Sequence, residues 1–213
     1  PMRYCKLGYV ALNVTDLDRS AAFYGDLLGL ESMGEVGGAW GFRCSGNHHD
    51  VLLYRADKPG LKRVAWEMEG AAELAAARDR FAAAGFAPRP VAADECEALR
   101  QGESFRLAEP ATGVTFEYYA TQRQPAAAWT PTVAKIQRLG HVVLNVEHFD
   151  QALASLTGDF GFVVSDRIAD MVAFMRCFPN PFHHSLAVAR SDATRLNHVN
   201  FMVSDIDDVG RAI

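Results

Sequence analysis

Eight consecutive residues occur twice in this chain with only two differences. Residues 7–14 read LGYVALNV, and residues 139–146 read LGHVVLNV. The interval of roughly 130 residues is too long for a solenoid repeat and is typical of a duplicated domain. We therefore predict two similar domains, at residues 1–122 and 134–213, joined by the Pro- and Ala-containing stretch at residues 122–131.

The two copies differ at the residues that could bind a metal. His141 in the second copy corresponds to Tyr9 in the first, and His198 in LNHV corresponds to Arg63 in LKRV. An arginine guanidinium does not lose its proton in proteins and so cannot ligate a metal. We therefore predict that any metal chemistry is confined to the second copy.

Each domain consists of smaller units that read as strand, helix and then three strands. Such units begin near residues 8, 63 and 137, and a fourth begins at Arg195. By the repeat, this last unit is cut off inside its helix at Ile213. The pattern predicts an α+β fold in which duplicated βαβββ units build two open, mixed or antiparallel, barrel-like sheets with outer helices.

Composition narrows the range of partners. The net charge is −5 and no run of Lys or Arg is present, which argues against nucleic acid and anionic lipid as partners. The four cysteines have no CxxC spacing and read as reduced thiols. No stretch is apolar for the length of a bilayer. We expect a cytoplasmic homo-oligomer that acts on small molecules.

The two histidines that are special to the second copy begin equivalent strands. Alternation places His141 and His198 on one face of strands 140–146 and 197–203. Neutral imidazoles are common ligands of iron, zinc and copper, and two of them with one carboxylate form a facial set with open positions opposite. The alternative is that both are ordinary core histidines.

In order and spacing, four motifs of the chain resemble one known group of proteins. They are LGHVVLNV around His141, FMRC and HHSLAVA before and around His184, and LNHVNFMVSDIDDVG around His198. The chain resembles the vicinal oxygen chelate superfamily, and within it the type I extradiol ring-cleaving dioxygenases of the biphenyl-2,3-diol and catechol 2,3-dioxygenase kind. The resemblance covers essentially all 213 residues.

This resemblance implies an Fe(II) enzyme of aromatic hydrocarbon catabolism, with Mn(II) as the alternative metal, that cleaves a catechol-type ring with dioxygen. It assigns metal binding to His141 and His198, acid/base catalysis to His184, and the substrate pocket to Val143 and Phe174. The third ligand would be a glutamate beyond Ile213, at about position 252 by repeat alignment. The loop at residues 178–182 is longer and richer in proline than the resemblance leads us to expect.

Several other polar residues read as structural. Glu117 is the first-copy counterpart of the missing ligand, and we predict that it pairs with Arg63 or accepts a hydrogen bond from Tyr9. The pair His48-His49 faces the domain without ligands and is assigned no chemistry. His148 is predicted to be a surface or capping residue, and the acidic residues 205–208 are predicted to cap a helix.

Two other classes of function remain open at this point. One is a glyoxalase-like isomerase or lyase that uses the same units with zinc, nickel or manganese. The other is a small-molecule binding protein of the bleomycin-resistance kind, which keeps the concave sheet without a metal. The mass of the native protein discriminates between a binder and an enzyme whose fourth unit is complete.

Overall fold

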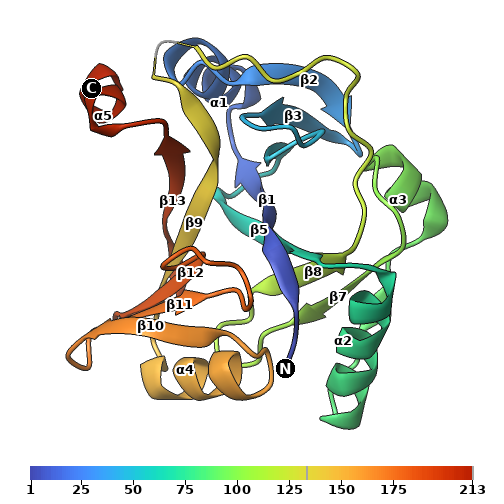
Figure 1. Ribbon diagram of the computed structural model, residues 1–213. Coiled ribbons are helices and arrows are strands. Elements are labelled where there is room, and N and C mark those ends of the chain that lie inside the picture. The colour runs from blue at the N-terminus through green and yellow to red at the C-terminus, as the bar shows by residue number, and fades with distance from the viewer. Residues whose placement is uncertain (133, 213) are drawn as a thin grey trace.

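The protein folds into two β-sheets with few helices, which confirms the α+β prediction (Figure 1). The computed structural model describes residues 1–132 and 134–212. The first sheet has the order β2-β3-β4-β1-β5-β8-β7-β6, and the second has the order β10-β11-β12-β9-β13. The strands of the first sheet are β1 (Tyr4–Val14), β2 (Glu31–Val36), β3 (Ala39–Arg43), β4 (Val51–Arg55), β5 (Gly60–Met68), β6 (Arg89–Pro90), β7 (Ser104–Ala108) and β8 (Thr115–Tyr119). Those of the second are β9 (Ile136–Val146), β10 (Val163–Ile168), β11 (Val172–Arg176), β12 (Leu186–Arg190) and β13 (Arg195–Val203).

The helices follow the predicted repeat, with one addition. They are α1 (Leu17–Ala22), which continues into a π-helical turn η1 (Phe23–Leu27), α2 (Ala71–Ala83), α3 (Ala93–Ala98), α4 (Phe149–Gly158) and α5 (Ile206–Arg211). The short helix α3 was not predicted, and it follows the two-residue strand β6. β6 pairs antiparallel with β7, with Pro90 opposite Phe105.

The two copies share strand pairing as well as sequence. β1 runs parallel to β4 and antiparallel to β5, and β9 runs parallel to β12 and antiparallel to β13. Ala11 lies opposite Arg63 in the first sheet, and Val143 lies opposite His198 in the second. Arg63 and His198 therefore occupy the same place in the two copies.

The cap predicted at residues 205–208 is confirmed, and Asp16 caps another helix. The Asp16 side chain accepts a hydrogen bond from the Arg19 backbone N–H at 2.9 Å, at the start of α1. Asp205 and Asp208 form a reciprocal capping box at the start of α5, so these carboxylates serve the helix. His148 is exposed at the N-terminus of α4. Among the described helices, none is long and apolar enough to cross a membrane.

One hydrophobic core serves both sheets. The Tyr4 ring stacks on Phe162 at a centroid distance of 5.0 Å, and the Trp66 ring meets the same Phe162 at 4.9 Å. The Tyr4 hydroxyl donates to the carbonyl of Phe160 at 2.5 Å. The core is therefore continuous between the two halves of the chain. The domain division proposed at residues 122 and 134 remains a prediction.

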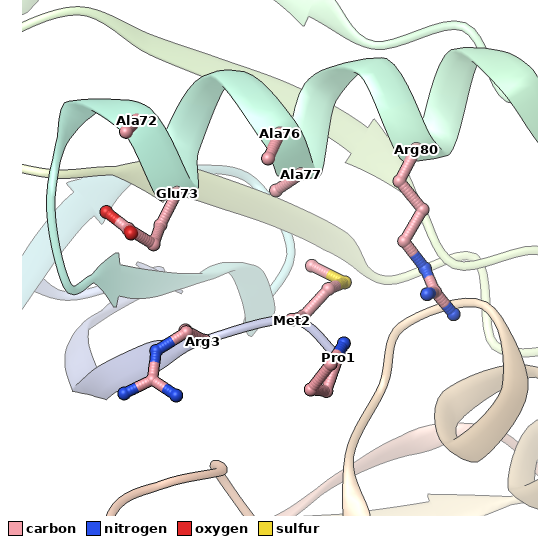
Figure 2. A pocket seen from close by; sticks show the side chains of 8 residues that line it. All are labelled: Pro1, Met2, Arg3, Ala72, Glu73, Ala76, Ala77 and Arg80. Atoms are coloured by element: carbon pink, nitrogen blue, oxygen red, sulfur yellow. The ribbon is translucent and has the colours of Figure 1, made fainter.

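A second contact between the halves lies beside α2. A cavity of about 520 Å³ lies between α2 and residues 1–3 and is also lined by Arg80. Figure 2 shows the Arg80 side chain extending from α2 on the same side as residues 1–3. Arg80 donates to the carbonyl of Gly158 at 2.6 Å and to that of Asp159 at 3.2 Å. These carbonyls end α4, where a cation satisfies acceptors that the helix leaves free.

Candidate metal centre

The two histidines predicted as ligands meet in the structure. The Nε2 atoms of His141 on β9 and His198 on β13 lie 3.2 Å apart. On β9, Val142 and Leu144 are fully buried on the core side, so His141 projects from the opposite face. The expected convergence of these two side chains is therefore observed, and they are not isolated core histidines.

A β-bulge sets the direction of His198. Leu196 lies opposite Leu144 and His198 lies opposite Val143, which leaves Asn197 as one extra residue on β13. The first copy has the same irregularity, with Leu61 opposite Leu12 and Arg63 opposite Ala11. The fold of each unit thus aims the residue at this position, whatever its identity.

The spacing of the two imidazoles fits a metal ion. With its two nitrogens 3.2 Å apart, the pair could bind one divalent metal ion through both rings. Burial, followed by the neighbouring His184 and His198, lowers the pKa of His141 to about 4. His141 is therefore neutral at pH 7 and keeps the lone pair that coordination requires.

No third ligand joins this pair within residues 1–132 and 134–212. No group of three His, Cys, Asp or Glu side chains in the described part of the chain is arranged to hold a metal. The expected glutamate beyond Ile213 therefore stays a prediction. Two imidazoles from neighbouring strands are the part of the ligand set that this structure presents.

His184 lies against the metal-ligand candidates. Its ring centroid is 4.2 Å from that of His141, and it meets the ring of Phe174 edge-on at 5.0 Å. Burial, and next the neighbouring His183, lowers the pKa of His184. The exposed His183 faces it, with 2.9 Å between the two Nδ1 atoms.

His183 and His184 lie outside β12, so strand alternation does not determine which of them faces the metal-ligand candidates. β12 begins at Leu186, and the two histidines belong to the loop that precedes it. Ser185 and Asn180 anchor this loop instead: the Ser185 carbonyl accepts from Val142 N–H at 3.1 Å, and Asn180 donates to the Cys5 carbonyl at 2.9 Å. His184 is placed beside His141 by this loop.

The two predicted pocket residues border the same group. Val143 is buried on β9 opposite His198, and its other neighbour in register is Ala187 of β12. Phe174 on β11 lies opposite that same Ala187 and is half-buried. Together they supply apolar surface next to the three histidines.

In the first copy the equivalent place is filled by a buried charge network. Glu117 accepts from the Tyr9 hydroxyl at 2.7 Å, and its other oxygen lies 3.1 Å from Arg63 Nε. Both predicted roles of Glu117 are thus confirmed. Gln101 and Arg106 also donate to this carboxylate.

One contact of the second copy was not predicted. Asn197 Oδ1 lies 2.8 Å from His198 Nδ1, and Asn197 donates to Asn145 Oδ1 at 2.7 Å. The sequence held a signal for it, since Asn197 stands beside His198 where the first copy has Lys62. That exchange accompanies the exchange of arginine for histidine.

Comparison with known proteins places this geometry in a family. The Glyoxalase/Bleomycin resistance protein/Dioxygenase superfamily matches residues 6–118. A biphenyl-2,3-diol 1,2-dioxygenase of Metapseudomonas furukawaii is 30% identical over 97% of this chain and 72% of its own length. An iron-dependent extradiol dioxygenase of Rhodococcus jostii is 27% identical over 96% of this chain and 74% of its own.

Solved structures agree on the fold. A halotolerant catechol dioxygenase superposes with a TM-score of 0.89 at 24% identity, over all of this chain and 74% of that protein. A Mn(II)-bound glyoxalase from Novosphingobium aromaticivorans superposes with a TM-score of 0.84 at 29% identity, over 99% of this chain and 69% of that protein. Both kinds of protein are thus built on the arrangement seen here.

Proposed function

Because the chain belongs to the glyoxalase/bleomycin resistance protein/dioxygenase superfamily, we propose that it is an extradiol ring-cleaving dioxygenase acting on a catechol-type substrate with dioxygen at one divalent metal ion. The observation that carries this proposal is the 3.2 Å approach of His141 Nε2 and His198 Nε2, with the His184 ring 4.2 Å from that of His141. The same places in the first copy hold a tyrosine, an arginine and a buried His49. Relatives named as extradiol dioxygenases support the reaction class.

We propose Fe(II) as the metal, with Mn(II) as the alternative. His141 and His198 would hold it, together with a glutamate beyond Ile213 near position 252 by repeat alignment. When bound, such an ion supplies Lewis acidity and adjacent positions for a catechol and dioxygen. The relatives include an iron-dependent enzyme and a Mn(II)-bound one, which supports both metals.

His184 is proposed as the acid/base residue. Its Nδ1 faces His183 at 2.9 Å, which leaves Nε2 as the nitrogen available to substrate. Burial, the first cause, lowers the pKa of His184 and favours its neutral form, in which Nε2 can accept a proton when Nδ1 donates toward His183. It can therefore accept a proton from a catechol hydroxyl and return one to the product as the ring opens.

Val143 and Phe174 are proposed to hold the ring of the substrate. Both present apolar surface beside the histidines, and apolar walls with a few converging polar groups are typical of small-molecule sites. A flat, substituted one- or two-ring catechol suits such a site. Phe174 also packs against His184, so it positions the acid/base residue while it excludes water.

We further propose a cytoplasmic location and self-association. All four cysteines are free, and Cys44, Cys96 and Cys177 are buried. Reduced thiols of this kind are the norm in the cytosol. Size measurement of the native protein tests the second point.

The reaction is tested directly with the full-length protein. After loading with Fe(II) without air, it should convert a catechol into a yellow semialdehyde and consume one dioxygen per ring. With labelled dioxygen, both oxygen atoms should enter the product. Incorporation of one atom, or formation of an intradiol diacid, would reject the extradiol reaction.

A glyoxalase-type activity is the second candidate, because the Novosphingobium glyoxalase shares 29% identity and a TM-score of 0.84 with this chain. An isomerase or lyase of that kind consumes no dioxygen. Turnover of a glyoxalase substrate by the Mn(II)-loaded protein, without oxygen uptake in the presence of catechols, would favour it over ring cleavage.

A further inference from the structure

We propose that Asn197, itself held by Asn145, is a positioning residue that fixes the tautomer and direction of His198. In this arrangement the ring proton of His198 sits on Nδ1, and Nε2 presents its lone pair toward His141. The inference deepens the proposed function, because it concerns the same metal site. It assigns a role to two side chains that the sequence motifs left without one.

The direction of the Asn197 amide follows from its partner. Its Nδ2 donates to Asn145 Oδ1 at 2.7 Å, so its Oδ1 is the atom that faces His198 Nδ1, at 2.8 Å. A carbonyl oxygen only accepts hydrogen bonds, so the ring nitrogen opposite it must carry the proton. A neutral imidazole then has its lone pair on Nε2, the atom 3.2 Å from His141.

The β-bulge explains how neighbours in sequence make this contact. Consecutive residues of a regular strand point to opposite faces, so Asn197 would normally be turned away from His198. The extra residue in β13 removes that alternation locally and brings the two side chains together. Asn145 lies on the adjacent strand β9, opposite Arg195, within reach of the bulged residue.

The first copy serves as an internal comparison. It has the same bulge and keeps Asn13 where the second copy has Asn145, but Lys62 stands in place of Asn197. A lysine ammonium has no acceptor, and Lys62 lies instead over the Tyr54 ring at 4.7 Å. The bulge therefore does not require an asparagine, and the amide pair occurs in the copy that has an imidazole to orient.

The expected consequence is a loss of metal affinity when the pair is broken. Outer partners that fix a ligating histidine typically contribute about 10- to 100-fold to metal binding. Asn197→Ala and Asn145→Ala should therefore weaken the binding of Fe(II) and of Mn(II) by about 10- to 100-fold. Asn197→Asp retains an acceptor and should restore most of the affinity.

The test combines nitrogen NMR of the histidine rings with metal titration of the full-length protein. In the metal-free wild type at pH above 7, His198 should show the Nδ1–H tautomer, and Asn197→Ala should lose that preference. Lys62→Ala and Asn13→Ala are the matched controls, since they change the same positions in the other copy. They should leave metal affinity and the His198 tautomer unchanged.

Two results would overturn the inference: an Nε2–H tautomer of His198 in the wild type, or unchanged metal affinity in both alanine variants. Thermal unfolding of each variant excludes a general loss of structure. If the wild type binds neither Fe(II) nor Mn(II), the proposed function fails. The tautomer of His198 then still decides whether Asn197 orients the ring.

Discussion

Tyr9 donates a hydrogen bond of 2.7 Å to Glu117 across the first sheet, at the place where the second copy has His141. Arg63 completes this contact from β5 and is, like Glu117, buried. The same strand positions therefore hold a buried ion pair in the first copy and two histidines in the second. In the first copy opposite charges neutralise each other, and in the second copy the two imidazoles of His141 and His198 face each other.

Alanine substitutions at His198 and at Arg63 should have different effects on metal binding and on stability. His198→Ala should abolish bound iron without a large loss of stability, because His198 is exposed in this structure. Arg63→Ala should keep bound iron but lower the free energy of unfolding by on the order of 3 kcal/mol, since it leaves a buried carboxylate short of a partner. Arg106 still pairs with Glu117 and limits that loss. Metal analysis and urea unfolding measure both effects, and the opposite pattern would reject the ligand assignment.

His184→Gln should retain iron and catechol binding while turnover falls on the order of a hundredfold or more, the usual scale for a general acid/base group. His183→Gln is the matched control, because His183 is the exposed member of the pair. Single-turnover kinetics of the iron-loaded variants measure the effect. Full activity of His184→Gln together with a slow His183→Gln would reverse the assignment of the two residues.

His49 should make the folded protein sensitive to acid. Burial, and then the neighbouring His48 and Arg63, lowers the pKa of His49 from 6.5 to about 3. Between these values the unfolded chain binds a proton that the folded protein does not, so stability is full above pH 6.5 and falls as the pH drops toward 3.

The size of that effect can be measured against a variant. Between pH 7 and pH 5 the wild type should lose about 2 kcal/mol more unfolding free energy than His49→Phe, in which the titrating group is absent. Exposed His148 provides the control, and His148→Gln should follow the wild type. Equal losses in His49→Phe and the wild type would show that this group does not cause the pH dependence.

Gly8 tests how closely β1 is packed. A Cβ at Gly8 would collide with the hydroxyl of Tyr119, a buried group with no hydrogen-bond partner among the described residues. Gly8→Ala should therefore lower the unfolding free energy by about 1–3 kcal/mol. Tyr119→Phe should be nearly neutral alone and should relieve part of that cost in the double variant. A purely additive double-mutant cycle would contradict this contact.

The amino-acid sequence by itself determined the duplication, the repeated βαβββ order and the residues of the candidate site. Alternation within a strand is a local property, so the face of His141 followed from its neighbours. The pairing of Glu117 with Tyr9 and Arg63 also followed, because a buried carboxylate beside an arginine has few other partners. The helix cap at residues 205–208 could also be predicted, because it depends only on neighbours in the sequence.

Only the tertiary structure decided how these pieces meet. A β-bulge is a property of two paired strands, so the contact of Asn197 with His198 was invisible in either strand alone. The position of His184 depends on a loop that Ser185 and Asn180 anchor to distant backbone, and no pattern within the loop's own sequence encodes that anchoring. The core contact between Tyr4 and Phe162 likewise joins residues far apart in the chain. Burial of apolar surface is non-directional, so no sequence pattern predicts which residues of the two sheets will pack together.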